Sequence, residues 1–382
     1  MRIGLDARTL VSPNRRGIGK AMLRLYHHLQ DGYPDWEVLA YHRSDQPVPD
    51  DLPASFTPIH IEIPGDRFDA WTQVRLPAAA RLDRVDVLHC PANFCPRWMP
   101  VSTVVTLHDL IPMDLPEGRS AAEMRRFEQA VAAACEKATA VFTPSHYTCN
   151  RLIHEHGLDP RRGIVVPWAV TLGSQTIDVH RAEEAVRSYG IDRGYLLHFG
   201  AGEPRKNTKE LIGAWAMVRR SYRQNWRLVV IGLDEKTMLD CRKLAQCLGI
   251  EKEVVLRGFI PEHNLPLLLT CASAMVYPSL SEGFGLPILE AFATATAVIA
   301  SDTTSLPEIA GDAALLVPPE SATSLATAMT QIMKDPMRRS DLAQRGNRRL
   351  QQFSWHRSAE LFGAALMAAA RARRATPRPA AA

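Results

Sequence analysis

The chain has 382 residues, of which 46% are hydrophobic and 23% are charged. This length suits two domains of roughly 170 to 200 residues better than one core. The composition is typical of a soluble globular protein, and no apolar run is long enough to span a bilayer. Seven cysteines without any Cys-x-x-Cys spacing argue against a disulfide framework and a zinc ribbon.

The formal charge of +4 lies at the carboxyl-terminal end of the chain. Residues 1–175 carry −1 and residues 176–370 carry +1. The remaining +4 comes from Arg371, Arg373, Arg374 and Arg378. A nucleic-acid-binding protein would more often carry its excess charge as a stripe on a folded surface, so no nucleic-acid partner is predicted. Residues 374–382, rich in Arg, Pro and Ala, are predicted to be disordered.

Short apolar strands alternate with amphipathic helical stretches along the whole chain. In the first half, strands are predicted at Arg2 to Asp6, Glu37 to Tyr41, Ile59 to Ile63, Val85 to Cys90, Val104 to Leu107, Ala140 to Thr143 and Ile164 to Val166. In the second half, they are predicted at Tyr195 to Phe199, Arg227 to Ile231, Val254 to Leu256, Ala274 to Tyr277, Ala297 to Ala300 and Ala314 to Val317. This alternation predicts an α/β fold of two Rossmann-like domains with parallel sheets, joined between Pro167 and Val186. No signal peptide precedes the first strand, so a cytoplasmic location is expected.

Ligands of such sheets bind beyond the carboxyl ends of the strands, so the residues that follow each strand are the candidates. The first strand leads into a loop over residues 12–20, in which Gly17 and Gly19 would give a phosphate or sugar close access to the backbone. The cations of that loop are Arg15, Arg16 and Lys20. A flexible surface loop with solvated charges is the alternative.

Two polar residues follow later strands of the first half. His108 comes directly after the fifth strand, where it is either a ligand contact or a structural histidine. Ser145 ends the next strand and is expected to cap a helix, with a ligand contact as a secondary role.

The first strand of the second half leads into Phe199-Gly200-Ala201-Gly202-Glu203-Pro204-Arg205-Lys206-Asn207. Arg205 and Lys206 at a helix start are suited to clamp a diphosphate, Arg through its fork and Lys as a point charge. Solvated charge at a helix end is the alternative. Farther along, Gly258 and Phe259 follow another strand.

The most informative stretch is residues 279–291, which predicts a strand, a glycine turn and a helix amino terminus. Gly283 and Gly285 allow a ligand to approach the backbone, and Pro287 fits a first helical position. The first-turn N–H groups, around Phe284 and Leu286, form an anion site. Glu282 in the turn and Glu290 one turn into the helix are placed to face one bound molecule, although both could simply be solvated.

The run Glu-Gly-Phe-Gly-Leu-Pro-Ile-Leu-Glu-Ala from Glu282 resembles the glutamate, seven residues, glutamate signature of retaining GT-B glycosyltransferases, most closely family 4. Two other segments also resemble sequences of this family: Glu-Pro-Arg-Lys-Asn at 203–207 and Thr-Leu-His-Asp at 106–109. One departure is Ala201, where many members carry an arginine. The resemblance covers nearly the whole chain and is loosest over residues 43–80.

The resemblance implies a GT-B fold, with two Rossmann-like domains facing across a cleft that closes on the donor. The first domain would comprise residues 1–175 and a final helix, 355–373, that crosses back to it, and the second residues 176–354. It also implies a function for each candidate. Glu290 would bind the ribose, Arg205 and Lys206 the diphosphate, and Glu282 and His108 the transferred sugar. The base would be held near Gly258 and Phe259, and the acceptor near the glycine loop and Ser145.

The opening Ile-Gly-Leu-Asp-Ala-Arg resembles the branch of bacterial mannosyl- and rhamnosyltransferases of surface polysaccharides. On that resemblance the expected donor is GDP-mannose and the expected acceptor a polyprenyl-diphosphate-linked oligosaccharide or another glycan. Such an acceptor implies peripheral contact with the inner face of the plasma membrane, through the cations of the glycine loop. No cofactor besides the nucleotide sugar is expected.

Several alternatives remain open. Glu282 could act as a covalent nucleophile, although the resemblance favours front-face substitution. No metal is predicted, since no Asp-x-Asp occurs and cationic side chains can neutralise the diphosphate. The donor could be a UDP- or ADP-sugar. An epimerase lacks the glutamate signature, a phosphorylase would need a pyridoxal-binding lysine segment, and a periplasmic sugar-binding protein would show a signal peptide.

Overall fold

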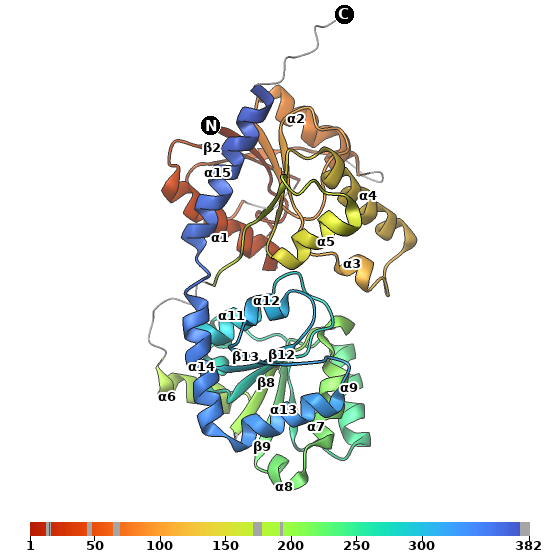
Figure 1. Cartoon of the computed structure of the whole chain (residues 1–382), viewed down its shortest axis with the longest axis vertical. Helices are drawn as coiled ribbons and strands as arrows, with labels where there is room; N and C mark the ends of the chain where they lie inside the picture. Colours follow the sequence, from red (N-terminus) through yellow and green to blue (C-terminus); the bar gives the residue numbers. More distant parts are fainter. Residues whose placement is uncertain are drawn as a thin grey trace, which may run out of the picture. The chain divides into compact units, whose positions relative to one another are not determined.

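The protein folds into two compact units, each built around one parallel sheet (Figure 1). The computed structural model describes residues 1–12, 15, 17–43, 48–63, 69–170, 178–191 and 194–374. The first unit contains Met1–Ala169 and the chain from Ser354 onward, and the second contains Val170–Phe353. Within the described residues, no helix is long and apolar enough to cross a membrane.

The sheet of the first unit has seven strands in the order β3-β2-β1-β4-β5-β6-β7, all parallel. They are β1 (Arg2–Asp6), β2 (Glu37–His42), β3 (Phe56–His60), β4 (Val87–Cys90), β5 (Thr103–Thr106), β6 (Ala140–Thr143) and β7 (Gly163–Val165). The central strands β4, β5 and β6 are buried at every position. Parallel strands that are covered on both faces are buried along their whole length, which explains why most residues of these three strands are apolar.

Helices cover both faces of this sheet. They are α1 (Gly17–Gly32), the π-helical turn η1 (Trp71–Arg75), α2 (Leu76–Leu82), α3 (Ile111–Asp114), α4 (Ala121–Lys137), α5 (His146–His156) and α15 (Trp355–Arg374). Leu76 of α2 and Phe127 of α4 belong to the apolar core that lies against one face. Tyr26 of α1 and Phe362 of α15 pack edge to face at 5.8 Å on the other.

The final helix α15 is an integral part of the first unit. Figure 1 shows it beside α1, and its Phe362 ring lies 4.8 Å from Phe142 of β6 and 5.1 Å from His89 of β4. Ser102 donates a hydrogen bond to the Ala369 carbonyl at 2.7 Å. The last helix of the chain therefore completes the core of the unit in which the chain begins.

The second unit repeats the architecture with six parallel strands in the order β10-β9-β8-β11-β12-β13. They are β8 (Gly194–Phe199), β9 (Trp226–Ile231), β10 (Val254–Leu256), β11 (Ala274–Tyr277), β12 (Ala297–Ser301) and β13 (Ala314–Val317). Its helices are α6 (Val179–Ser188), the 3-10 turn η2 (Pro204–Lys206), α7 (Thr208–Met217), α8 (Arg220–Arg223), α9 (Glu235–Cys247), the 3-10 turn η3 (Glu262–Asn264), α10 (Leu265–Cys271), α11 (Leu286–Ala293), α12 (Leu306–Ala310), α13 (Ala322–Lys334) and α14 (Pro336–Leu350).

The predicted fold class, two Rossmann-like domains with parallel sheets, is confirmed. Most predicted strand ends agree with the structure within one or two residues, and two local predictions differ more. The third strand spans Phe56–His60 rather than Ile59 to Ile63, because Pro58 is tolerated in a strand that pairs on one side only. Helix α1 begins at Gly17, so Gly17 and Gly19 are helical rather than part of an open loop.

Candidate functional site

The candidate site of the second unit lies where the direction of strand order reverses. Strands β8 and β11 are neighbours, but the chain leaves β8 toward β9 on one side and β11 toward β12 on the other. Doubly wound sheets bind ligands in the crevice at such a switch point, beyond the carboxyl ends of the strands. The segment after β8 carries Arg205 and Lys206, and the segment after β11 carries Glu282. The Leu280 N–H donates to the Arg205 carbonyl at 2.8 Å and joins the two segments.

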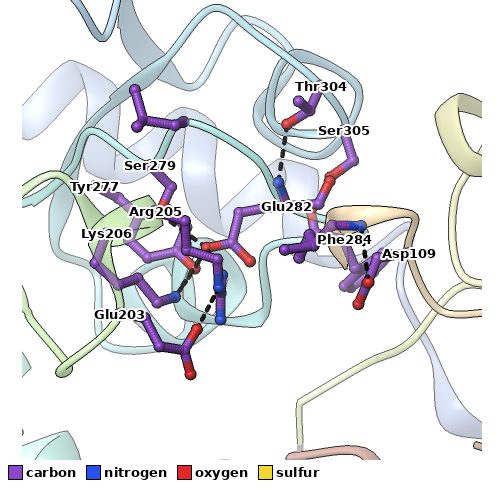
Figure 2. Close-up of polar contacts among 12 residues, drawn as sticks. Asp109, Glu203, Arg205, Lys206, Tyr277, Ser279, Glu282, Phe284, Thr304 and Ser305 are labelled. Atoms are coloured by element: carbon purple, nitrogen blue, oxygen red, sulfur yellow. Dashed lines mark hydrogen bonds and ion pairs between the residues drawn. The ribbon is translucent and has the colours of Figure 1, made fainter. Parts of the chain in front are cut away.

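Glu282 is the centre of a buried polar cluster at this switch point (Figure 2). Its Oε1 lies 2.6 Å from Nη1 of Arg205 and accepts a hydrogen bond from Nζ of Lys206 at 2.8 Å. The hydroxyls of Tyr277 and Ser279 donate to the same oxygen at 2.6 and 2.8 Å. No hydrogen bond from the described residues reaches Oε2. One carboxylate oxygen is thus fully committed to the protein, and the other has acceptor capacity left for a ligand.

The charges of this cluster support one another. Burial alone would raise the pKa of Glu282, but Lys206 and Arg205 hold that pKa below its ordinary value. Burial lowers the pKa of Lys206 against the opposing pull of Glu282. Burial also opposes the charge of Arg205, yet Glu282 and Glu203 raise its pKa. Glu282 is therefore a carboxylate at neutral pH, held by two cations on one side.

Arg205 and Lys206 are positioned by a turn rather than by a helix. They lie in η2, and Asn207 then adopts a left-handed conformation with φ of 59° before α7 begins. The Asn207 side chain donates to the Pro319 carbonyl at 2.7 Å, which fixes the turn to the loop after β13. The Nη1 atom of Arg205 is buried and has no partner with hydrogen-bond geometry among the described residues, although it forms the ion pair with Glu282.

The glycine turn before α11 is held by the loop after β12. The Ser305 hydroxyl donates to the carbonyls of Glu282 and Phe284, both at 2.9 Å, and the Glu282 N–H donates to Thr304 at 3.3 Å. Gly285 has φ of 111°, and a Cβ built on it would lie 2.7 Å from Leu306. Only glycine fits both the conformation and the space. Pro287 is the second residue of α11, one position later than the predicted first helical position.

We expect the substitution Gly285→Ala to lower both stability and donor binding. The left-handed backbone and the contact with Leu306 should together cost about 1–3 kcal/mol of unfolding free energy. The matched control is Gly213→Ala in α7, where a Cβ meets nothing within 4 Å and should be neutral or stabilising. Urea unfolding of both variants measures the difference, and equal midpoints would contradict it.

The remaining residues predicted for the donor lie in the same unit. Glu290 is in the second turn of α11 and is half-buried, while Gly283 and Phe284 are buried and Leu286 is half-buried. Gly258 and Phe259 follow the edge strand β10, and Phe259 is 87% exposed. The Gly258 carbonyl accepts from Gly232 at 2.9 Å. Their predicted roles with the nucleotide stay predictions.

His108 belongs to the first unit, directly after β5, and is 2% exposed. Its Nε2 lies 2.5 Å from the Pro91 carbonyl, so Nε2 carries the proton and Nδ1 is an acceptor. Burial lowers the pKa of His108 to about 4, with the Pro91 hydrogen bond opposing, so the ring is neutral near pH 7. Nδ1 is buried and has no partner among the described residues. The ring can therefore accept a hydrogen bond from a hydroxyl, but it cannot supply a positive charge.

The residues predicted near the acceptor are also in the first unit and are not all available to a ligand. Arg15 forms an ion pair with Asp51, with 2.6 Å between Nη2 and Oδ1, and also contacts the Leu10 carbonyl. Lys20 and Gly17 are exposed on the first turn of α1. Arg16 lies outside the described residues. A Cβ on Gly19 would lie 2.3 Å from the Thr9 carbonyl, so this glycine is needed for packing.

Ser145 is fully buried and caps α5, accepting from the Thr148 N–H at 3.2 Å. The helix cap expected from the sequence is confirmed.

Sequence reasoning did not assign roles to Tyr277 and Ser279, which complete the Glu282 cluster. Tyr277 ends β11, and its pKa is raised far above the ordinary value by burial and by Glu282. Ser279 lies three residues before Glu282, a spacing at which a hydroxyl reaches a side chain in the same turn. Two hydroxyl residues beside the first glutamate of the signature were the available signal.

No group of three or more His, Cys, Asp or Glu side chains that could hold a metal ion gathers among the described residues. That the reaction needs no metal stays a prediction.

Curated relatives of this chain are bacterial glycosyltransferases. O-antigen chain mannosyltransferase B of Escherichia coli is 29% identical over 284 residues, which cover 74% of each chain. Serotype-specific mannosyltransferase WbdA of Escherichia coli is 28% identical over 269 residues, 69% of this chain, but the match spans only 33% of the relative's length. D-inositol 3-phosphate glycosyltransferase of Kineococcus radiotolerans is 31% identical over 232 residues, 55% of this chain and 53% of that protein.

Solved structures share the fold of nearly the whole chain. Sucrose-phosphate synthase from Thermosynechococcus elongatus superposes with a TM-score of 0.75 at 20% identity, covering 97% of this chain and all of that one. WaaG, a glycosyltransferase involved in lipopolysaccharide biosynthesis, gives a TM-score of 0.73 at 16% identity, covering 95% and 98%.

Two family models match consecutive parts of the chain. The model described as Glycosyltransferase Family 4 matches residues 15–173, and the model described as Glycosyl transferases group 1 matches residues 182–349. The second match contains Arg205, Lys206, Glu282 and Glu290. The chain therefore belongs to the glycosyltransferases of the two-domain GT-B class, with a family 4 domain followed by a group 1 domain.

Proposed function

We propose that the protein transfers mannose from GDP-mannose, with retention of configuration, onto a lipid-linked oligosaccharide or polysaccharide during bacterial surface polysaccharide synthesis. The observation that carries the transfer reaction is the cluster of one ionised glutamate and two cations at the switch point of the second sheet. The choice of mannose and of a surface polysaccharide is supported by the O-antigen mannosyltransferases among the relatives.

The two cations and the two glutamates each bind a different part of the donor. Lys206 and Arg205 bind the diphosphate and stabilise the negative charge that grows as the C1–O bond breaks. Glu282 accepts hydrogen bonds from the sugar hydroxyls through Oε2 and orients the ring. Glu290 accepts from the two ribose hydroxyls, a pairing that suits a carboxylate. The cations take the place of a divalent metal, so the reaction proceeds without one.

The substitution takes place on one face of the sugar. The acceptor oxygen bonds to C1 on the side from which the diphosphate departs, and the acceptor proton passes to the departing phosphate oxygen. A covalent role for Glu282 is disfavoured because Oε1 already accepts three hydrogen bonds and forms an ion pair with Arg205, and the two cations lower the pKa and hence the basicity of the carboxylate.

The first test of this proposal is nucleotide binding. Thermal shifts with GDP, UDP and ADP should show the largest stabilisation with GDP, since a ligand that binds only the folded state raises its melting temperature. Turnover of GDP-mannose should survive EDTA, and NMR of the product should show the α-anomer of the donor retained. Stabilisation by UDP or ADP instead of GDP would identify a UDP- or ADP-sugar as the donor. The absence of stabilisation by any of the three nucleotides would overturn the proposal that the protein is a nucleotide-sugar-dependent transferase.

The second test addresses the nucleotide contact. Glu290→Gln should weaken nucleotide binding by about 10- to 100-fold, the equivalent of one or two hydrogen bonds to a charged group. Glu235→Gln, on an exposed residue at the start of α9, is the matched control. Unchanged binding by Glu290→Gln would remove this residue from the site.

A different acceptor is the second candidate function. The relatives include D-inositol 3-phosphate glycosyltransferases, whose name places a phosphorylated inositol in the reaction of those proteins. Transfer of the sugar to a soluble inositol phosphate rather than to a lipid-linked glycan would favour that reading.

A further inference from the structure

A hollow of about 280 Å³ lies in the first unit, and none of the Glu282 cluster residues lines it. Three segments line it: the start of η1, the loop after β4 and the first half of α4. Both η1 and the loop follow strands of the first sheet, and α4 connects β5 to β6. The hollow is therefore built from segments at the carboxyl ends of parallel strands, where α/β sheets bind ligands.

Three arginines dominate the lining: Arg97 from the loop and Arg125 and Arg126 from α4. Among the described residues, none of their guanidinium groups takes part in an ion pair or side-chain hydrogen bond. Other arginines of this unit do pair: Arg151 contacts Asp114 and Glu155, each at 2.7 Å. Asp69 is the one acidic side chain of the lining. Like charges gathered around one hollow repel each other, so the arrangement favours a bound polyanion.

The geometry of the hollow is held by contacts among its walls. Gln73 of η1 accepts from the Arg97 N–H at 3.0 Å and donates to the Cys95 carbonyl at 3.3 Å. The Cys95 thiol contacts the Ala130 carbonyl of α4 at 3.5 Å. The loop that carries Arg97 is thus attached to both neighbouring segments, which places its cation beside those of α4.

The charge of the hollow comes from side chains and not from the amino terminus of α4. Ser120 and Glu123 form a reciprocal capping box, in which the Ser120 hydroxyl accepts from the Glu123 N–H and the Glu123 carboxylate accepts from the Ser120 N–H. An anion in the hollow would therefore be held by the arginine forks, which match phosphate oxygens in geometry.

We propose that Arg97, Arg125 and Arg126 form a subsite for the phosphate or diphosphate group of a phosphorylated acceptor. This inference rests on the proposed transfer to a lipid-linked acceptor and identifies the part of the first unit that recognises it. A hollow of this volume is at the small end of ligand pockets and suits a diphosphate better than an oligosaccharide. Phe94 in the lining is 36% exposed and Trp98, next to Arg97, is 51% exposed. These aromatic surfaces suit the isoprenoid chain that adjoins the diphosphate.

The test compares two acceptors with the same glycan, one linked to a prenyl diphosphate and one to a methyl group. In the double variant R125Q/R126Q, the KM for the diphosphate acceptor should rise about tenfold or more, since two charge-assisted contacts are lost. The KM for the methyl glycoside and the hydrolysis of the donor should not change. The control variant R81Q/K137Q removes two exposed cations outside the hollow and should match the wild type on both acceptors.

A binding measurement keeps the inference separate from the proposed function. Farnesyl diphosphate is titrated into two proteins: the full chain carrying Lys206→Met, and the same chain that also carries R125Q/R126Q. The substitution at Lys206 keeps the contribution of the donor cluster to binding small. Binding by the first protein and its loss in the second support the subsite even where no transfer activity is found. Equal binding by both proteins overturns it. Loss of binding to phosphatidylglycerol vesicles, with farnesyl diphosphate binding unchanged, would also overturn it, because the arginines would then contact membrane lipid.

Discussion

The substitution Lys206→Met should lower kcat for sugar transfer by about 100- to 1,000-fold, the loss typical of removing one preorganised group that stabilises developing negative charge. Nζ of Lys206 is 2.8 Å from Glu282 and 2.7 Å from the Tyr277 hydroxyl, so its position is fixed before a ligand arrives. Methionine keeps the length of the side chain and removes the charge. Release of nucleoside diphosphate from the donor measures the effect.

The matched control is Lys209→Met, three residues farther along the chain. Its ammonium lies 3.3 Å from Asp240 and its side chain is 64% exposed, so its loss should leave kcat unchanged. Unfolding of Lys206→Met should remain close to that of the wild type, because Arg205, Tyr277 and Ser279 still contact Oε1 of Glu282. A Lys206→Met enzyme that keeps more than a tenth of wild-type turnover would exclude Lys206 from the chemistry.

The substitution Glu282→Gln should reduce activity to a similar extent and also destabilise the fold. Without the carboxylate, Arg205 and Lys206 are buried beside each other with no common counter-ion, at a cost of about 3 kcal/mol. Because the pKa of Glu282 is lowered from 4.5 in the folded state, its stabilising contribution is complete above that ordinary value and is lost as the pH falls through the folded-state pKa. The stability difference between wild type and variant should therefore shrink below about pH 4.5.

Urea unfolding from pH 3 to 8 tests this dependence. A difference that stays constant over the range would show that the charge of Glu282 does not stabilise the cluster. Mass spectrometry of the wild type quenched during turnover separates the two roles of this residue. A glycosyl group on Glu282 would establish the nucleophile and remove the front-face proposal.

The sequence predicted the strand, turn and helix around Glu282 well because their signals are local. The turn at Gly285, the helix that follows it and the position of Glu290 in that helix depend on residues within one short stretch. The alternation of strands and helices likewise identified both sheets. Arg205 and Lys206 contact the same oxygen of Glu282 because β8 and β11 are neighbours in the sheet. Only the strand order reveals that they are neighbours.

Contacts between distant segments account for what the sequence did not predict. Arg15 reads as a loop cation, but its partner Asp51 lies 36 residues farther along the chain. The arginines at 97, 125 and 126 belong to a surface loop and an ordinary amphipathic helix, and only their packing brings them around one hollow. The residues that flank a charged side chain in the sequence do not indicate whether it pairs with a side chain far along the chain.

The place of α15 in the first unit sets an order for folding during synthesis. The ribosome completes the whole second unit before it makes Phe362, the ring that packs against Phe142 and His89. Until α15 is synthesised, the face of the first sheet that α15 covers therefore remains exposed, while the second unit can already fold. The protein is in this sense an inserted domain carried within an unfinished one, and its earliest residues are among the last to reach their final environment.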